Sequence, residues 1–241
     1  MEKVILIRYG EIHLKGQNRP YFERMLLDNI KKALKGYEGL KVIRAQGRYY
    51  IENMGDNPQI LNRMSKVFGV TSFSPALKVK KDMDSIRRAA EIVLKEAMLE
   101  EGTDELTFKV ESRRSGKRFP LNSMELSRGM GAHLLQKYPE TKVDVHNPRV
   151  RVYIEVREWA YVYHRIIPGA GGMPVGSNGK SVLLLSGGID SPVSGWMIAK
   201  RGVELVAVYF HSFPYTSDRS KEKVIELCRI LEQYCGSIKL Y

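Results

Sequence analysis

The strongest constraint on the fold of this chain is an apolar run that leads directly into a glycine-rich turn. The run is Ser181–Leu185, and the turn that follows, residues 186–191, has the sequence SGGIDS. A continuous apolar run of this length is typical of a strand buried on both faces. Paired glycines let a backbone approach an anion without an intervening Cβ. The residues from Pro192 onward suit the first turn of a helix, whose N–H groups favour negative charge. The sequence therefore predicts a strand, a phosphate-binding turn and a helix.

A glycine-rich turn without any ligand is the alternative to a phosphate-binding turn. A bare Gly-Gly pair would favour that alternative, but the full six residues after a buried strand favour phosphate. A second phosphate-binding pattern, the Walker A loop, is imitated by Gly179-Lys180-Ser181. That pattern also needs a glycine where this chain has Pro174, and a helix where the sequence predicts a strand. The Walker A interpretation is therefore excluded.

Composition limits the class of protein to which the chain can belong. Its 241 residues, 43% of them hydrophobic, allow roughly one to three domains with buried cores. No apolar run reaches the roughly 18 residues that cross a bilayer, and the charged, strand-like N-terminus does not resemble a signal peptide. Two cysteines, Cys228 and Cys235, argue against a disulfide scaffold and fit the reducing cytosol as buried apolar residues. We therefore expect a cytoplasmic protein without a membrane partner.

The net charge of +12 is large for a chain of this size, and the excess of Lys and Arg lies mostly before residue 169. A positive field of this kind raises the local concentration of polyanions, among which nucleic acid is the obvious partner. A solvated basic surface accounts for the charge equally well. The charge alone therefore leaves both interpretations open.

A cluster of cations indicates where nucleic acid would bind. Between a predicted strand, Glu105–Glu111, and a predicted helix from Asn122, residues 112–118 contain four cations and no acid, and we expect the next residue to expose an aromatic ring. Arginine forks bind phosphate oxygens through paired hydrogen bonds, and an aromatic ring stacks on an unpaired base. A solvated basic turn is the alternative, which the combination of charge, glycine and aromatic disfavours. The candidate RNA-binding residues are Arg113, Arg114, Lys117, Arg118 and Phe119, with Arg149 downstream.

Hydrophobic periodicity divides the chain into four parts. Residues 1–57 predict strand, helix, strand and strand, and residues 58–167 alternate helices and strands as a second domain. Residues 168–179 are rich in Pro and Gly and predict a linker or a functional loop at a domain boundary. Residues 180–241 predict the βα units of a doubly wound parallel sheet. They are too few for a whole domain, so we expect the chain to be truncated at its C-terminus.

The remaining reactive side chains form no pattern of their own. The five histidines lack the spacing of metal ligands, and a zinc site would also need cysteines paired at short spacing. We therefore expect no structural metal. No histidine is placed beside Ser186 or Ser191, so a nucleophilic serine is not indicated.

Several short segments, spread in order over essentially the whole chain, carry a family resemblance. They are RYGE (residues 8–11), SRR (112–114), FPLNS (119–123), PGAGG (168–172), SGGIDSPV (186–193) and FHSFPYTS (210–217). Together they resemble the tRNA 4-thiouridine synthetases, also called tRNA uridine 4-sulfurtransferases. The resemblance implies a ferredoxin-like domain at residues 1–57, a THUMP RNA-binding domain at 58–167, a linker at 168–179 and an incomplete ATP pyrophosphatase domain at 180–241.

The resemblance also implies an activity and its partners. ATP would transfer AMP to O4 of uridine 8 in tRNA, and sulfur from a persulfide would then displace AMP to leave 4-thiouridine. A cysteine desulfurase would supply the persulfide, Mg²⁺ would accompany the ATP phosphates, and the protein would form a homodimer. The same sulfur feeds thiazole synthesis for thiamine in many members of the family.

The residues of the turn take their roles from the same resemblance. Asp190 would hold the metal or orient the phosphates, and it is the expected catalytic residue. The expected ATP-binding residues lie at the carboxyl ends of two adjacent strands, where open α/β sheets bind ligands. They are Leu184, Leu185, Ser186, Gly187, Gly188, Asp190, Ser191, Tyr209 and Phe210.

Two alternatives to this enzyme stay open at the level of sequence. The cysteine that handles sulfur in the family lies beyond this chain, and neither Cys228 nor Cys235 matches it. The chain could therefore be a tRNA-binding fragment without catalysis. It could also be another ATP pyrophosphatase, although the upstream RNA-binding domain disfavours an amide-forming synthetase and the PGAGG segment disfavours other tRNA thiolases.

Overall fold

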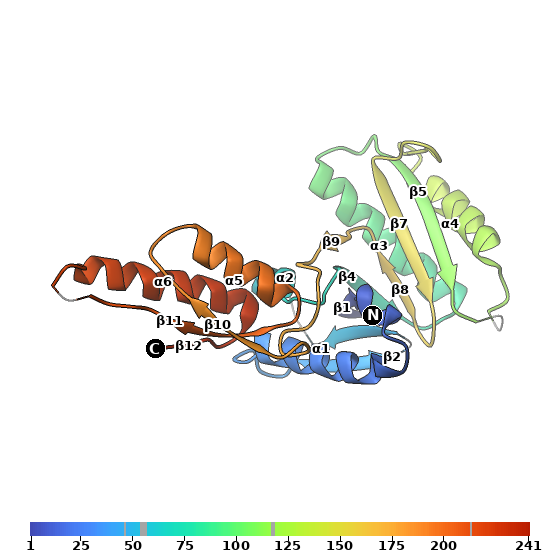
Figure 1. The fold of residues 1–241 in the computed structure, drawn as a ribbon. Helices are drawn as coiled ribbons and strands as arrows, with labels where there is room; N and C mark the ends of the chain where they lie inside the picture. Colours follow the sequence, from blue (N-terminus) through green and yellow to red (C-terminus); the bar gives the residue numbers. More distant parts are fainter. Residues whose placement is uncertain (46, 54–56, 117–118, 213) are drawn as a thin grey trace. The chain divides into compact units, whose positions relative to one another are not determined.

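The computed structural model describes residues 1–45, 47–53, 57–116, 119–212 and 214–241. The chain divides into two compact units, each of which is described by itself. Unit 1 comprises Met1–Leu6, Tyr50–Gly55 and Ser74–Ile166, and unit 2 comprises Ile7–Tyr49, Asp56–Phe73 and Ile167–Tyr241. In chain order (Figure 1) the elements are β1 (Glu2–Arg8), the 3-10 helices η1 (Glu11–Leu14) and η2 (Gly16–Asn18), α1 (Arg19–Ala33), β2 (Lys41–Ala45), β3 (Arg48–Glu52), α2 (Pro58–Ser65), β4 (Ser72–Val79), α3 (Met83–Glu101), β5 (Thr107–Arg114), α4 (Ser123–Lys137), β6 (Lys142–Val143), β7 (Val150–Val156), β8 (Ala160–Tyr163), β9 (Ile167–Pro168), β10 (Lys180–Leu184), α5 (Asp190–Lys200), β11 (Glu204–Val208), α6 (Asp218–Cys235) and β12 (Lys239–Leu240).

The helices and strands that periodicity predicts are present, and the predicted mixture of α/β and α+β architecture is confirmed. The strands β6 and β9 have two residues each, which is too short to give a periodic pattern in the sequence. Within the described part of the chain, no helix combines the length and apolar character needed to cross a membrane. The division of the chain after residues 57, 167 and 179 stays a prediction.

The described strands form two sheets. The larger has the order β2-β3-β1-β4-β8-β7-β5-β6, with β9 paired to β4. Its strands β5 and β7 are parallel, whereas β8 is antiparallel to both β7 and β4. The smaller sheet has the order β10-β11-β12, and both of its strand pairs are parallel. The smaller sheet has the parallel βα order predicted for residues 180–241. The prediction that Ser181–Leu185 is buried on both faces is wrong, because Val182 is 61% exposed and Leu184 is 62% exposed.

Unit 1 has its core on one face of β4, β8, β7 and β5. Because successive side chains of a strand point to opposite faces, β5 buries Phe108 and Val110 while Lys109 and Glu111 stay half-buried. The helices α3 and α4 cover the apolar face (Figure 1) and share one cluster of buried side chains with it. Asn122 starts α4 with a capping box, which satisfies N–H groups that the first helical turn leaves unpaired.

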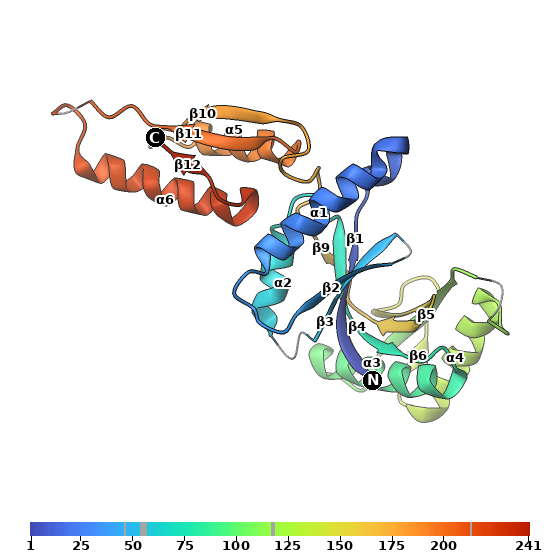
Figure 2. The ribbon, with the colours of Figure 1, turned by 90° about the horizontal axis from the view of Figure 1, so that it is seen from below.

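The smaller sheet of unit 2 carries α5 and α6 on one side (Figure 2). Leu184 and Val208 pair in register, so β10 and β11 end at the same level. Gly195 lets α5 come close to β10, since a Cβ there would lie 2.6 Å from a methyl carbon of Leu183. The helix α5, which begins at Asp190 within the glycine-rich turn, therefore packs directly against β10.

The segment predicted as a linker or a functional loop is held in unit 2 by backbone hydrogen bonds. Gly171 N donates to Val70 O at 2.8 Å, and Met173 N donates to Lys200 O at 2.9 Å. We call residues 168–173 the strap. Its main chain is therefore ordered by contacts with segments that lie far from it in the sequence.

Two neighbouring glycines of the strap differ in the space around them. Gly171 and Gly172 both have a left-handed backbone, with φ of 66° and 74°. A Cβ on Gly172 would lie 2.3 Å from Lys200 O, whereas no described residue comes within 4 Å of a Cβ on Gly171. A backbone oxygen in a packed unit cannot move aside as the end of a flexible side chain can. Gly172 is therefore required by close packing as well as by its backbone conformation.

We expect Gly172→Ala to lower the free energy of unfolding by more than Gly171→Ala does. Both changes strain a left-handed backbone, at a cost of about 1–2 kcal/mol each, and Gly172→Ala adds a clash worth roughly 1–3 kcal/mol. Chemical denaturation of the two variants, followed by circular dichroism, measures the difference. Equal losses would show that the approach of Lys200 O does not constrain this position.

Candidate functional site

Hydrogen bonds between its own serines hold the turn after β10 in shape. Ser186 N donates to Ser191 Oγ at 2.9 Å, and the two hydroxyl oxygens lie 3.1 Å apart. Gly188 N also reaches Ser186 Oγ, at 3.4 Å. The turn is thus held in shape by hydrogen bonds between its first and last residues. Hydroxyls and N–H groups of this kind can bind phosphate oxygens, as the sequence predicts.

The two glycines of the turn are not required by the fold itself. Neither Gly187 nor Gly188 has a left-handed backbone. Among the described residues, a Cβ on Gly187 would meet only Lys223 Cδ, at 3.7 Å, and a Cβ on Gly188 would meet only Ser186 Oγ, at 3.5 Å. Both distances are ordinary van der Waals contacts. The absent Cβ atoms leave a cradle on the open side of the turn, which fits the close approach of phosphate groups.

Asp190 is the first residue of α5 and is exposed. Its carboxylate has no ion-pair partner among the described residues and stands where a phosphate-binding turn would bring further negative charge. Like charges this close repel unless a cation lies between them. Within the described ranges no three His, Cys, Asp or Glu side chains are grouped as metal ligands. A single carboxylate fits Mg²⁺, which proteins bind through one or two carboxylates together with substrate phosphates.

The four residues expected to contact adenosine differ in exposure. Leu184 is 62% exposed and Phe210 is 73% exposed, so both offer apolar surface beside the turn. Leu185 is 2% exposed and packs in the core, which leaves only its main chain for a ligand. Tyr209 is half-buried, and its hydroxyl has no hydrogen-bond partner among the described residues. The structure therefore brings these residues together at one edge of the sheet. Leu184 and Phe210 could contact a ligand through their side chains, whereas Leu185 could do so only through its main chain.

The arginines of the basic segment lie at the end of β5 in unit 1. Arg113 is exposed. Arg114 donates from one guanidinium nitrogen to the carbonyl oxygens of Phe119 and Leu121, at 3.1 and 3.2 Å. Arg114 therefore holds the main chain at Phe119 and Leu121, while the exposed side chain of Arg113 can face a ligand.

The expectation that Phe119 exposes its ring is wrong. The residue is 8% exposed and belongs to the apolar core that α3 and α4 share with the sheet. A ring buried there cannot stack on a base. Lys117 and Arg118 lie outside the described residues.

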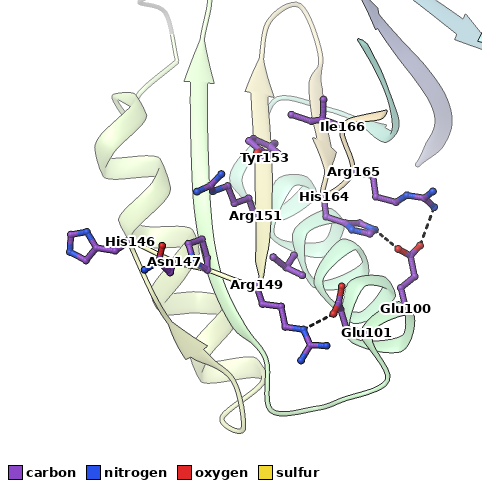
Figure 3. Close-up of a pocket in the computed structure, with 12 residues that line it drawn as sticks. Glu100, Glu101, His146, Asn147, Arg149, Arg151, Tyr153, His164, Arg165 and Ile166 are labelled. Carbon is purple, nitrogen blue, oxygen red and sulfur yellow. Dashed lines mark hydrogen bonds and ion pairs between the residues drawn. The ribbon is translucent and has the colours of Figure 1, made fainter. Parts of the chain in front are cut away.

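Arg149 lines a pocket of about 560 Å³ at one end of unit 1 (Figure 3). Its Nε lies 2.5 Å from Glu101 Oε2, at the end of α3. In the same pocket Glu100 pairs with Arg165 at 3.3 Å and lies 3.9 Å from His164. Burial lowers the pKa of His164, and Arg165 adds to this, although the acid nearby opposes it. To bind an RNA phosphate, the Arg149 guanidinium would therefore have to give up its ion pair with the Glu101 carboxylate.

Two further cations line this pocket. Arg151 lies in β7 two residues after Arg149, which directly precedes the strand, and Arg165 follows β8. Arg149 and Arg151 belong to one short basic segment of the sequence, so the sequence can indicate Arg151. Nothing in the sequence links Arg165 to them, because the turn between β7 and β8 separates the two strands.

Both cysteines are buried on α6, as the sequence predicts. Burial raises the pKa of the Cys228 thiol, and it raises that of Cys235 to about 12. Because the thiolate is the form that handles sulfur, neither residue suits that chemistry.

Known proteins resemble the chain over its whole length. Residues 4–74 match the family model of the ThiI ferredoxin-like domain, residues 80–165 match the THUMP domain, and residues 176–241 match the thiamine biosynthesis protein ThiI. These matches confirm the predicted order of a ferredoxin-like domain, a THUMP domain and the start of a pyrophosphatase domain.

Individual relatives and solved structures agree with the family models. A probable tRNA sulfurtransferase of Acetivibrio thermocellus is 52% identical over all of this chain, which spans 62% of that protein. A 4-thiouridine synthetase, solved in complex with RNA and with bound ATP, superposes with a TM-score of 0.89 at 37% identity. The match covers all of this chain and 61% of that one. The PH1313 protein of Pyrococcus horikoshii gives the same TM-score at 31% identity, over all of this chain and 78% of its own. The chain therefore belongs to the tRNA sulfurtransferase, or 4-thiouridine synthetase, family.

Proposed function

We propose that this chain is the ATP- and tRNA-binding portion of a sulfurtransferase that converts uridine 8 of tRNA to 4-thiouridine. The observation that carries the proposal is the turn at residues 186–191. Ser186 and Ser191 hold its shape through hydrogen bonds, and Gly187 and Gly188 leave open space although the packing of the fold would admit a side chain there. The relatives named as tRNA sulfurtransferases support it, as does the neighbour named as a 4-thiouridine synthetase with RNA and ATP.

In the proposed reaction the uridine O4 attacks the α-phosphorus of ATP, and pyrophosphate leaves. Persulfide sulfur then attacks C4 of the uridine and AMP leaves, so that the uridine is joined to the donor cysteine through an S–S bond. A second thiol attacks the sulfur of that cysteine, forms a disulfide with it and releases 4-thiouridine. The backbone of Gly187 and Gly188, with the hydroxyls of Ser186 and Ser191, would bind the pyrophosphate. Asp190 would hold Mg²⁺, which supplies positive charge to the phosphates when it is bound.

The adenosine of ATP would lie at the edge where β10 and β11 end. The exposed side chains of Leu184 and Phe210 offer apolar surface to a base. The main-chain N–H groups of Leu185 and Tyr209 already donate to Val208 O and Tyr241 O, so these two residues offer only their carbonyl oxygens. This assignment places nucleotide and turn at the carboxyl ends of parallel strands, where open α/β sheets bind their ligands.

Further parts of the proposal concern tRNA and the other partners. Arg113, Lys117, Arg118 and Arg149 would contact tRNA phosphates. Arg114 would support the surface indirectly, through its hydrogen bonds to Phe119 O and Leu121 O. A cysteine desulfurase would donate the sulfur in the cytoplasm, and the protein would act as a homodimer. The same sulfur would be available for thiamine synthesis.

Asp190→Ala should lower the tRNA-stimulated release of AMP about 100-fold or more. The reason is that Mg²⁺, which would neutralise the phosphates, loses the carboxylate that would hold it. AMP release from ATP is measured with and without unmodified tRNA. The affinity for tRNA should stay unchanged.

Asp84→Ala is the matched control, since Asp84 also stands in the first turn of a helix, α3, and is exposed. It should leave AMP release as in the wild type. If no version released AMP in response to tRNA while tRNA still bound tightly, the chain would be a tRNA-binding module and the enzyme assignment would fail.

Gly188→Ala should weaken ATP binding by about tenfold without lowering the free energy of unfolding. The added methyl group meets only Ser186 Oγ in the described structure, but it fills the cradle that phosphate needs. Calorimetric titration with ATP and thermal unfolding of the same sample measure the two effects. A loss of stability with unchanged ATP affinity would indicate an ordinary turn without a ligand.

Arg113→Ala should weaken tRNA binding and reduce the slope of log affinity against log salt by about one, as expected for one lost phosphate contact. The change suits this test because Arg113 is exposed, whereas Arg114 carries two hydrogen bonds of the fold. Arg114→Ala should instead lower the melting temperature. An unchanged affinity and slope for Arg113→Ala would remove the basic segment from the RNA interface.

A further inference from the structure

We infer that Lys223 of α6 binds the pyrophosphate part of ATP in the turn at residues 186–191. The inference rests on the proposed function and adds a residue to its phosphate site. The observation behind it is the approach of two elements: a Cβ on Gly187 would meet Lys223 Cδ at 3.7 Å and no other described atom within 4 Å. The aliphatic part of Lys223 thus borders the cradle, and its ammonium group lies two bonds further along the side chain.

The charge of the turn explains why a cation is needed there. Residues 186–191 contain no Lys or Arg, and Asp190 adds a negative charge. The phosphates of ATP are themselves anionic, so the turn and its ligand together carry only negative side-chain and phosphate charge. A Mg²⁺ ion at Asp190 would offset part of this charge. A lysine ammonium, which is a compact point charge with three donors, can offset more on the side of Gly187.

Lys223 is available for this role. It is exposed and has no ion-pair partner among the described residues. By contrast, Lys180 pairs with Glu204 at 3.0 Å, at the other end of β10 from the turn. Lys200 lies over the ring of Trp196, 4.8 Å from its centroid, at the end of α5. These two lysines are therefore occupied elsewhere.

The packing of α6 determines which of its side chains face the turn. Val224, Cys228, Leu231 and Cys235 are buried at helical spacing, which fixes the rotation of the helix about its axis. Lys223 and Lys221 are two residues apart, so they point to opposite sides of the helix. Lys221 is equally exposed and carries the same charge. It therefore serves as a matched comparison for the effect of position.

The experiment measures the dissociation constants of ATP, inorganic pyrophosphate and AMP by calorimetric titration in the presence of Mg²⁺. Lys223→Ala should weaken the binding of ATP and of pyrophosphate by about tenfold or more, since it removes a charge-assisted hydrogen bond. AMP, which lacks the pyrophosphate, should bind within about twofold of the wild type. Lys223→Arg should restore most of the affinity for pyrophosphate, and Lys221→Ala should change it by less than about twofold.

Three outcomes would count against the inference. If Lys223→Ala bound pyrophosphate as tightly as the wild type, Lys223 would make no contact. If Lys221→Ala caused an equal loss, the effect would be that of overall charge. If Lys223→Ala weakened the binding of AMP as much as that of pyrophosphate, the substitution would act through the shape of the site. A wild-type protein that bound neither ATP nor pyrophosphate would instead overturn the proposed function, and the inference with it.

Discussion

The parallel pairing of β10 with β11 is the constraint on which the candidate ATP site depends. Because Leu184 lies opposite Val208, the turn after β10 and the residues after β11 meet at one edge of the sheet. The same pairing brings α5 and α6 together on one face, and so brings Lys223 beside Gly187. A slip of one residue between the two strands would turn every side chain of one strand to the other face and disperse the site.

Features that are encoded in consecutive residues could be predicted from the sequence. The strand, the turn and the helix around residues 186–191 follow one another directly, so their order and their chemistry are local. The start of α4 is likewise local, since Asn122 and Glu125 form the capping box within four residues of chain. The family membership could be recognised because its motifs also occur in order along the chain.

Features that depend on contacts between distant residues could not be predicted in this way. Phe119 follows a run of cations, and nothing in that run shows that Arg114 would hold the next residues so that the ring enters the core. Lys223 is one of several cations on α6, and only the packing of that helix places it at the turn. The carboxylate partner of Arg149 lies on α3, far from it in sequence. In each case the face that a side chain occupies is decided by tertiary packing.

The glycines of unit 2 show how structure separates the needs of the fold from those of a ligand. Gly172 stands in a left-handed backbone against a carbonyl oxygen, so the protein itself excludes a side chain there. Gly187 and Gly188 have neither a left-handed backbone nor a close contact that would exclude a side chain. They nevertheless lie where phosphate would approach the backbone. In the sequence both segments are rich in glycine, with three glycines among the six residues of the strap and two among the six of the turn. The space beside Gly187 and Gly188, which in the described structure is bordered only by Lys223 Cδ and Ser186 Oγ, is therefore the physical observation that favours the proposal of an anion at the turn.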